Sequence, residues 1–499
     1  MNIAMLLQMA AEACPDRRAL TSGGRHYTYA ELYGGARTAA ARIRASGCAY
    51  ASVLDTSSPA VPIMLMGAAM AGVPYVPLNY RLANEQLSAL LERIAPVYLI
   101  AEAEHQALAR DKGATVTGRE AFLSDTLGGA SDGIGESDWP ADPSAVAVQL
   151  FTSGTTGEPK AAILRHEHLV SYILGTVEFM GADEDEATLI SVPPYHIAGI
   201  AAVMSSIYAC RRMVQLPDFG AAAWLELAEH ESVTHAFVVP TMLARVVDHL
   251  ETIERPPHVP SLRAIAYGGG KMPQPVIERA LALFPDVAFT NAYGLTETSS
   301  TITLLGPEDH REALASDDPA VRRRLGSVGR PLPQVEIEIR DENGNVLGPE
   351  QPGEIYVRGP QVSGEYLGRK ALDDDGWFPT RDAGFLDADG YLYLSGRADD
   401  VIVRGGENIS PGEIEDVLLA HEAVADAVVV AIPSVEWGET VGAAVVLKPD
   451  HSVTVHELQH FVKARLRSSR VPEVIRFEES LPYTDTGKLL RRVVRQRFD

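Results

Sequence analysis

The 499-residue chain contains little cysteine. Its three cysteines, Cys14, Cys48 and Cys210, lie far apart, and none of them belongs to a Cys-x-x-Cys pair. This spacing fits neither a disulfide framework nor a zinc site. The sequence therefore predicts reduced and buried thiols.

Basic residues and long apolar runs are also scarce. The chain has 43 Lys and Arg against 67 Asp and Glu, a formal net charge of −24, which argues against nucleic acid and anionic membranes as partners. The longest apolar stretch, Val61 to Val76, contains two prolines and two glycines and does not predict an integral membrane segment. Because Met1 to Met9 has no basic residue, we expect no signal peptide and a cytoplasmic protein.

The length exceeds what one compact core usually contains, so at least two domains are expected. Helical patterns alternate with short apolar runs over 27–100 and 145–300, as in an open and largely parallel sheet. Beyond residue 333, short alternating strands around Asn343-Gly344 and Asp389-Gly390 predict antiparallel hairpins. We expect an α/β fold: a large N-terminal domain with mixed, largely parallel sheets layered with helices, a β-rich subdomain, and a small mobile α+β C-terminal domain.

The last hundred residues read as a unit with its own core. Ser410 to Glu413 has the pattern of a capping box with proline at the first helical position, and predicts a helix to about His421. Two strands and a second capped helix, from Thr454 to near Arg467, follow. The predicted boundaries are 1–395 for a domain that holds a nucleotide and an acyl group, 396–399 for a hinge, and 400–499 for a mobile lid domain.

The most informative segment is the loop from Phe151 to Lys160, FTSGTTGEPK. It follows the predicted buried strand Ala145 to Leu150, and it offers two glycines, four hydroxyls and one cation, which suit a polyphosphate. It is neither a Walker A loop nor a nucleophile elbow, and an ordinary polar turn is the alternative for the loop taken alone. The candidate phosphate ligands are Thr152, Ser153, Gly154, Thr155, Thr156, Gly157 and Lys160.

Three further motifs follow in order: Tyr293 to Glu297 (YGLTE), Gly396 to Asp400 (GRADD) and Pro482 to Lys488 (PYTDTGK). Together with the loop, this set resembles the acyl-adenylate-forming superfamily, which includes acyl-CoA synthetases, stand-alone adenylation enzymes and luciferases. The resemblance spans about Tyr27 to Arg492, and its specificity lies in the order and separation of the motifs. It implies ATP, Mg²⁺ and coenzyme A as cofactors and a small carboxylic acid as substrate.

In this resemblance Glu297 is the Mg²⁺ ligand, and Thr296 donates to the α-phosphate. A carboxylate beside a phosphate loop suits Mg²⁺, although a helix N-cap pair is the alternative. Tyr293 would stack on adenine. The resemblance places further nucleotide or acyl contacts at Gly268, Gly269, Gly270, Asn291, Ala292 and Gly294.

Asp382 occupies the position at which the family has an aspartate for the two ribose hydroxyls, and a carboxylate has two acceptor oxygens for such a diol. Arg381 stands where relatives usually have glycine. Arg397 would be a second ribose or phosphate contact, with an ordinary surface arginine as the alternative. Asp399 is the predicted hinge residue, because Asp tolerates unusual φ angles, and the adjacent Asp400 is the alternative.

Lys488 is the predicted catalytic cation, since positioned positive charge is the main requirement when a carboxylate attacks a phosphate. Gly405 and Gly406 would border the pantetheine of coenzyme A, with a β-bulge as the alternative. His196 would gate the acyl site, or it is a packed core histidine. The segment Ile197 to Met204 carries no charge, so a pocket walled by it favours an apolar or aromatic acid over a dicarboxylate.

The sequence thus predicts an AMP-forming acid–thiol ligase that makes an acyl-adenylate and pyrophosphate and then transfers the acyl group to coenzyme A. One alternative is a stand-alone adenylation enzyme that loads a carrier-protein phosphopantetheine or another nucleophile. A second is a nucleotide-binding regulatory or scaffold protein that has lost catalysis. No feature of the sequence predicts an oligomeric state.

Overall fold

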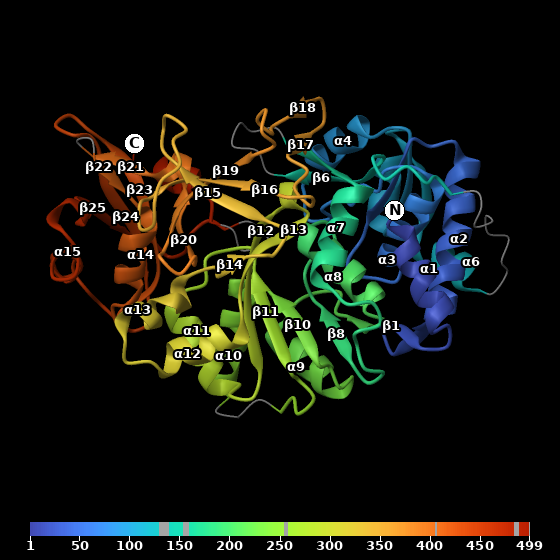
Figure 1. Cartoon of the computed structure of the whole chain (residues 1–499), viewed down its shortest axis with the longest axis horizontal. Helices are drawn as coiled ribbons and strands as arrows, with labels where there is room; N and C mark the ends of the chain where they lie inside the picture. Colours follow the sequence, from blue (N-terminus) through green and yellow to red (C-terminus); the bar gives the residue numbers. More distant parts are fainter. Residues whose placement is uncertain (129–138, 153–158, 254–257, 405–406, 484–488, 499) are drawn as a thin grey trace.

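The structure is a computed structural model that describes residues 1–128, 139–152, 159–253, 258–404, 407–483 and 489–498. Figure 1 shows a large N-terminal body and a smaller C-terminal part beside it, which confirms the predicted α/β class with a large and a small domain. In these residues, no helix combines the length and apolar character needed to span a membrane.

A nine-stranded sheet forms the centre of the large body. Its six inner strands, from β12 to β1, are parallel, and antiparallel strands close both edges. The carboxyl ends of parallel strands are where such sheets usually bind ligands. The order is β14 (Arg330–Pro331), β13 (Ser300–Leu305), β12 (Ala288–Leu295), β11 (Ala264–Gly268), β10 (His235–Val238), β8 (Ala187–Ile190), β9 (Arg212–Gln215), β1 (Arg18–Ser22) and β2 (Arg25–Thr28).

Helices bury the apolar faces of this sheet in two separate cores. Trp224, Tyr267 and Phe289 are completely or almost completely buried in one of them, between the strands and the helices α9 (Ala221–His230), α10 (Pro240–Thr252) and α11 (Gln274–Leu283). The other core is built mainly by α1 (Ala4–Ala13), α2 (Tyr29–Ser46), α3 (Ala60–Ala71), α7 (His166–Thr176) and α8 (Ile197–Tyr208).

A second layer of strands carries the predicted phosphate loop. The hairpin strands β6 (Val146–Thr152) and β7 (Lys160–Arg165) pair with β17 (Glu365–Tyr366) and β18 (Arg369–Lys370). Through isolated bridges of Tyr75, β6 also meets the parallel strands β3 (Tyr50–Leu54), β4 (Val97–Ala101) and β5 (Thr115–Gly118). The helices beside these strands are α4 (Asn84–Arg93), α5 (Ala103–Arg110) and α6 (Arg119–Leu127).

The β-rich part after residue 333 is antiparallel, as predicted. Its order is β15 (Glu336–Arg340), β16 (Gly353–Arg358), β19 (Phe378–Leu386) and β20 (Leu392–Arg397). The short helices η2 (Thr296–Thr298), α12 (Pro307–Ala315), α13 (Pro319–Arg322) and η3 (Arg323–Gly326) precede these strands in the chain.

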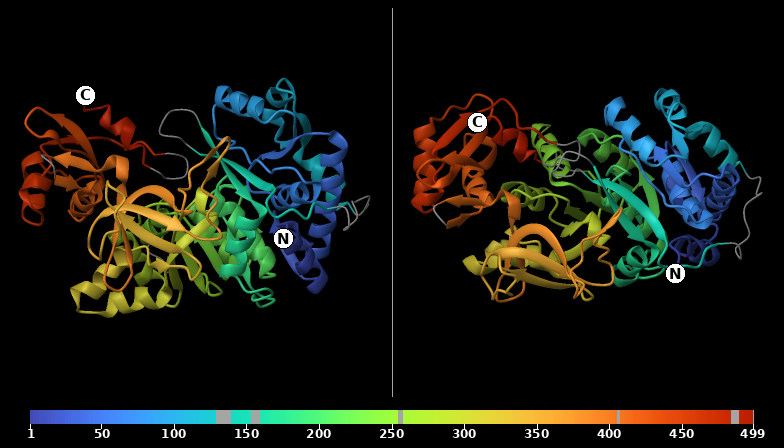
Figure 2. Two further views of the ribbon diagram at one scale, coloured as in Figure 1. Left: turned by 45° about the horizontal axis from the view of Figure 1, so that its top comes forward. Right: turned by 90° about the horizontal axis from the view of Figure 1, so that it is seen from above.

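The C-terminal part contains a hydrophobic core of its own. The turn η4 (Ala398–Asp400) leads from β20 into the C-terminal part, and Figure 2 shows this part in two further views. Its elements are β21 (Ile402–Arg404), β22 (Glu407–Ile409), α14 (Pro411–Leu419), β23 (Val424–Ser434), β24 (Gly438–Leu447), α15 (Val455–Lys463), η5 (Ser468–Arg470), β25 (Val474–Phe477) and α16 (Arg491–Arg495).

The two predicted capping boxes of this part have different outcomes. The one at Thr454 is confirmed, because its hydroxyl accepts the N–H of Glu457 while the Glu457 carboxylate accepts the N–H of Thr454. The one at Ser410 is wrong. The Ser410 hydroxyl makes no cap and donates instead to the backbone oxygen of Ser395 at 2.6 Å, which ties the start of α14 to β20.

Candidate active site

The predicted phosphate loop is anchored where its strands end. Thr152 and Lys160 are register partners at the tip of the β6–β7 hairpin, and the Thr152 hydroxyl lies 3.4 Å from the Lys160 carbonyl oxygen. Arg93 donates to the carbonyl of Pro159 at 2.8 Å, and its guanidinium lies 4.9 Å from the centre of the Phe151 ring. One cationic side chain, that of Arg93, therefore contacts both ends of the loop. Ser153, Gly154, Thr155, Thr156 and Gly157 lie outside the described residues.

Lys160 and Glu297, which come from different motifs, meet at one tyrosine. The Tyr366 hydroxyl donates to Glu297 Oε1 at 2.6 Å, and Lys160 Nζ lies 5.9 Å from the centre of the Tyr366 ring. Burial and the Glu297 charge raise the pKa of Tyr366, so its hydroxyl remains protonated and donates. The fold thus brings the predicted loop cation and the predicted metal ligand together. Sequence reasoning did not find Tyr366.

The turn that carries Glu297 is strained and tightly packed. Thr296 is half-buried at its start, and Glu297 is buried. Ser299 and Ser300 follow with φ angles of 57° and 112°, and residues other than glycine rarely adopt such angles. A Cβ on Gly294 would overlap the carbonyl of Ser300, so only glycine fits there. Such strain clusters at functional sites, where the surrounding structure enforces it.

The three predicted adenosine contacts also lie together. Asp382 accepts from the Tyr293 hydroxyl at 2.6 Å and from Arg397 Nη1 at 2.9 Å, and Arg397 also donates to the carbonyl of Thr380. Asp382 and Arg397 are register partners in β19 and β20, which explains their meeting. Arg381, the departure from the family pattern, has a φ of 63°. It therefore adopts the backbone conformation for which glycine is the usual residue.

The glycine-rich segment 268–270 packs against the neighbouring strand. Gly268 and Ala292 are register partners in β11 and β12, and a Cβ on Gly268 would overlap the Ala292 carbonyl. Gly269 has a φ of 81°, and Gly270 lies beside Pro240. Asn291 is buried and donates to the carbonyl of Ser327 at 3.1 Å. Asn291 and Gly268 thus have structural roles that position the carboxyl ends of two central strands.

His196 stands at the N-terminal cap of α8 and is half-buried. Its Nε2 is buried and has no hydrogen-bond partner in the described part of the chain. Burial, with a smaller contribution from Arg81, lowers its pKa to about 4, so the imidazole is neutral near pH 7. An unpaired buried nitrogen normally has a ligand or water partner. The role of His196 as a gate stays a prediction.

The predicted wall of the acyl pocket, Ile197 to Met204, belongs to α8 and is largely buried. Ile200, Val203 and Met204 are buried in the core between the helices. Ile197, Ala198 and Ala202 are half-buried on the same helix. Ile197 and Ala202 pack against the same core, so this segment contributes mainly to the packing between the helices.

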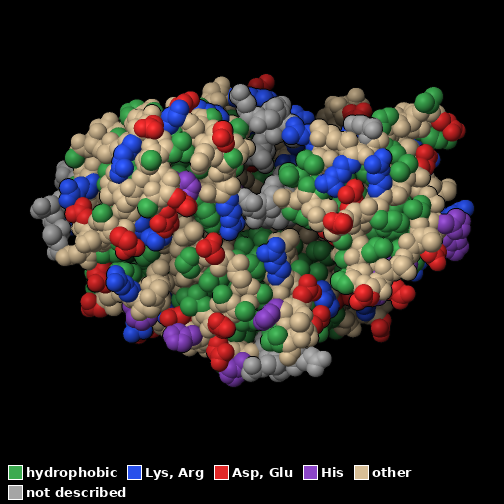
Figure 3. Space-filling model, turned by 180° about the vertical axis from the view of Figure 1, so that it is seen from behind, with side chains coloured by type: hydrophobic (Ala, Val, Ile, Leu, Met, Phe, Trp, Pro, Cys, Tyr) green, Lys and Arg blue, Asp and Glu red, His purple; other side chains and the backbone are tan. Residues whose placement is uncertain are grey.

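The predicted residues of the C-terminal part are the least described. Gly405, Gly406 and Lys488 lie outside the described residues, and so does the side chain of Asp399, whose backbone belongs to η4. The β21–β22 hairpin that flanks Gly405 and Gly406 is described. Figure 3 shows the opposite face of the molecule from Figure 1, hollowed near its middle with Lys and Arg side chains close to the hollow.

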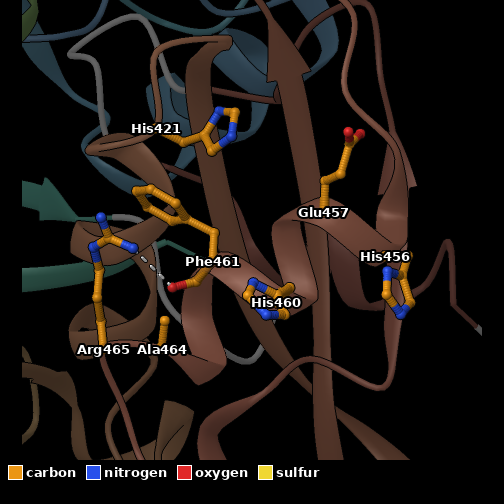
Figure 4. A pocket seen from close by; sticks show the side chains of 7 residues that line it. All are labelled: His421, His456, Glu457, His460, Phe461, Ala464 and Arg465. Carbon is orange, nitrogen blue, oxygen red and sulfur yellow. Dashed lines mark hydrogen bonds between the residues drawn. The ribbon is translucent and has the colours of Figure 1, made fainter.

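A separate surface pocket of about 340 Å³ lies on α15 in the C-terminal part. The helix α15 contains the sequence His456-Glu457-Leu458-Gln459-His460, in which the two histidines have the spacing of a zinc-binding helix. However, the Glu457 carboxylate caps its own helix, and in Figure 4 the rings of His421, His456 and His460 lie apart from one another. No group of three or more His, Cys, Asp or Glu among the described residues is placed to hold a metal ion.

These observations define a two-domain, adenylate-forming type of enzyme. The sequence model of the AMP-binding enzyme family matches residues 7–367, and that of the AMP-binding enzyme C-terminal domain matches 413–488. The chain therefore belongs to the AMP-binding enzyme family, within the acyl-adenylate-forming superfamily. It is a ligase of the AMP-forming acyl-CoA synthetase class.

Similar proteins cover nearly the whole chain. A 2-succinylbenzoate–CoA ligase of Bacillus licheniformis is 32% identical over 97% of this chain and 98% of its own length. The fatty acid–[acyl-carrier-protein] ligase ScoC of Streptomyces coeruleorubidus is 32% identical over 97% of this chain and 94% of its own length. The structure of O-succinylbenzoate coenzyme A synthetase from Bacillus subtilis, in complex with ATP and magnesium ion, has a TM-score of 0.84 and 29% identity, and covers 98% of each chain.

Proposed function

We propose that this protein uses ATP to convert an apolar or aromatic carboxylic acid to its acyl-adenylate, with release of pyrophosphate, and then transfers the acyl group to coenzyme A. The observation that carries the proposal is the meeting of Lys160 with Glu297 through Tyr366, and of Tyr293 with Arg397 through Asp382. One group suits phosphates and the other suits a ribose.

The residues present fit a magnesium ion. One Glu297 oxygen accepts from Tyr366, and the hydrogen bonds of the described residues leave the other oxygen unengaged. Mg²⁺ in nucleotide sites takes one or two carboxylates and completes its shell with phosphate oxygens and waters. Glu297 would hold the ion, which when bound neutralises phosphate charge.

The side chains divide the work in the first half-reaction. Lys160 places positive charge beside the phosphates, and Asp382 accepts the ribose hydroxyls while Tyr293 and Arg397 fix its position. His196, neutral near pH 7, offers an unpaired nitrogen at the acyl site for the substrate carboxyl group. Lys488 supplies the second cation when the carboxylate attacks the α-phosphorus.

The substrate class follows from α8 and from the relatives. Ile197, Ala198 and Ala202 are apolar, uncharged and only half-buried. The named substrates of the relatives are 2-succinylbenzoate, an aromatic acid with two carboxyl groups, and a fatty acid, an aliphatic acid with one. A panel of fatty, aromatic and dicarboxylic acids in an ATP–pyrophosphate exchange assay, followed by addition of coenzyme A, tests the proposal. Failure of every acid to support exchange would refute it.

Transfer to a carrier-protein phosphopantetheine is the second candidate, and the relative ScoC is the observation that favours it. Turnover with coenzyme A alone distinguishes the two candidates. If coenzyme A alone supports turnover with AMP release, coenzyme A is the acceptor. If turnover needs a carrier protein, the second candidate replaces the first.

A first prediction concerns Lys488. Changing Lys488 to Ala should slow acid-dependent exchange by about a hundredfold or more, because a preorganised charge of this kind contributes several kcal/mol to a transition state. Thioester formation from pre-made acyl-adenylate should be largely preserved. Equal losses in the two assays would contradict the role of Lys488 in the first half-reaction.

A further inference from the structure

Tyr366 connects two parts of the nucleotide site that the chain supplies from distant positions. Its hydroxyl donates to Glu297 Oε1 at 2.6 Å, which is a short, charge-assisted hydrogen bond. Its ring lies under the Lys160 ammonium, with 5.9 Å between Nζ and the ring centre. A single side chain therefore contacts both the predicted metal ligand and the predicted phosphate-binding cation.

The strand that carries Tyr366 is firmly attached to the loop hairpin. Tyr366 is the register partner of Ala162 in β7, and the N–H of Leu367 donates to the carbonyl of Ala161 at 2.9 Å. The adjacent Glu365 accepts two hydrogen bonds from Arg165, at 2.8 and 2.9 Å. A bidentate pair of this kind fixes geometry as well as charge. Tyr366 thus has little freedom to move away from β7.

The segment just before Tyr366 holds the turn of Glu297. The Gln361 side-chain amide donates to the carbonyls of Thr298 and Thr301, at 3.0 and 2.7 Å. The N–H groups of Ser363 and Gly364 donate to the carbonyl of Glu297, at 2.8 and 3.2 Å. These bonds restrain the backbone of the turn, and Tyr366 restrains the carboxylate itself.

We propose that Tyr366 is a positioning residue that fixes one Glu297 oxygen and so aims the other at a magnesium-bound nucleotide. The inference deepens the proposed function and rests on it. A carboxylate that ligates a metal is usually held by a hydrogen bond to its second oxygen, and loss of such a partner typically weakens metal binding by 10- to 100-fold. The ring of Tyr366 also holds the Lys160 ammonium near Glu297 through a cation–π contact.

The test is the magnesium dependence of ATP binding in the Tyr366→Phe variant of the full chain, measured by isothermal titration calorimetry without acid. We expect the variant to need about tenfold more Mg²⁺ for half-maximal enhancement of ATP binding. Its ring remains, so the Lys160 contact and the binding of ATP without Mg²⁺ should be unchanged. An unchanged or lower magnesium requirement would overturn the proposal.

Tyr391→Phe is a matched control. The Tyr391 hydroxyl also donates to a carboxylate at 2.6 Å, that of Asp309, and cations also lie over its ring, those of Arg324 and Arg330. It lies outside the proposed nucleotide site. Its loss should lower stability but leave the magnesium requirement unchanged. A rise in the magnesium requirement equal to that of Tyr366→Phe would assign the effect to general destabilisation and overturn the proposal.

A double-mutant cycle with Glu297→Gln gives a second readout. If Tyr366 acts through Glu297, the double variant should need the same Mg²⁺ concentration as Glu297→Gln alone. Full additivity of the two single effects would contradict positioning. The proposed function fails separately, when the unchanged protein supports no acid-dependent exchange, and this result does not depend on any Tyr366 variant.

Discussion

A contact between Lys271 and α14 predicts how the two domains share the two half-reactions. Lys271 directly follows the segment 268–270, and its ammonium donates to the carbonyl of Gly412 at 3.1 Å and to Asp416 Oδ2 at 2.8 Å. The partners lie on the C-terminal side of the predicted hinge. This contact therefore stabilises one orientation of the domains.

We propose that the present orientation of the domains serves the first half-reaction. The hydrogen bonds of Val403, Arg404 and Glu407 in the β21–β22 hairpin go to partners within the C-terminal part, such as Glu439, Glu473 and Arg470. The hairpin that flanks Gly405 and Gly406 is thus engaged with its own domain. Transfer to a thiol, as proposed, requires this hairpin to approach the nucleotide site after a rotation of the domain.

The size of the effect follows from the two bonds. A half-exposed ion pair contributes about 0.5 kcal/mol, and the hydrogen bond to Gly412 contributes about 1 kcal/mol. A cation near the N-terminus of α14 costs about 0.5 kcal/mol through the helix dipole. The net value is about 1 kcal/mol, so Lys271→Met should change the equilibrium between the two orientations by about fivefold.

The assay is the ratio of two rates, acid-dependent ATP–pyrophosphate exchange and thioester formation from pre-made acyl-adenylate. The ratio should fall about fivefold in Lys271→Met, since each rate scales with the population of its own orientation. Arg279→Met is the control, because Arg279 forms exposed ion pairs with Asp248 and Glu251 and none with the described residues of the C-terminal part. An unchanged ratio, or an equal change in the control, would refute this reasoning.

Two further predictions concern single residues of the site. Arg381→Gly should raise the free energy of unfolding by about 0.5–1 kcal/mol, because relief of the strain at φ 63° exceeds the added chain entropy; a loss in chemical denaturation would contradict this. Because the pKa of His196 falls from 6.5 to about 4 on folding, the unfolded chain binds more protons, and stability is lost as the pH falls through this window. Melting temperatures of His196→Gln should therefore fall less between pH 6.5 and 4 than those of the unchanged protein, and parallel curves would contradict the burial of a neutral imidazole.

Local patterns predicted the elements of the fold well. The strand before the phosphate loop and the hairpins around Asn343 and Asp389 all form, because alternation and turn residues act over a few neighbouring positions. Ser410 shows where such rules fail. The local pattern predicts that its hydroxyl caps the helix, but the hydroxyl donates to the carbonyl of Ser395 in β20 instead.

In the candidate site, too, some residues could be predicted from short motifs and others could not. Residues that would touch the nucleotide could be predicted, because few residue types can hold a metal, a diol or a phosphate, and they occur in short motifs. The ends of the phosphate loop and the groups around Asp382 lie where that reasoning requires. Which side chains of α8 line the acyl pocket stays a prediction, since a helix of uncharged residues does not reveal which face enters the core.

The residues that hold the ligand-binding groups in place could not be predicted from motifs. Tyr366 lies 69 residues from Glu297 in the chain, and Lys271 lies 141 residues from Gly412. A hydrogen-bond donor for a carboxylate can come from many residue types at any separation, so a supporting contact has no short sequence pattern. Such contacts nevertheless determine whether a carboxylate points at a metal and which orientation a domain prefers. In this protein the motifs therefore define the chemistry, and the long-range contacts that only the fold reveals determine how well and in which order it proceeds.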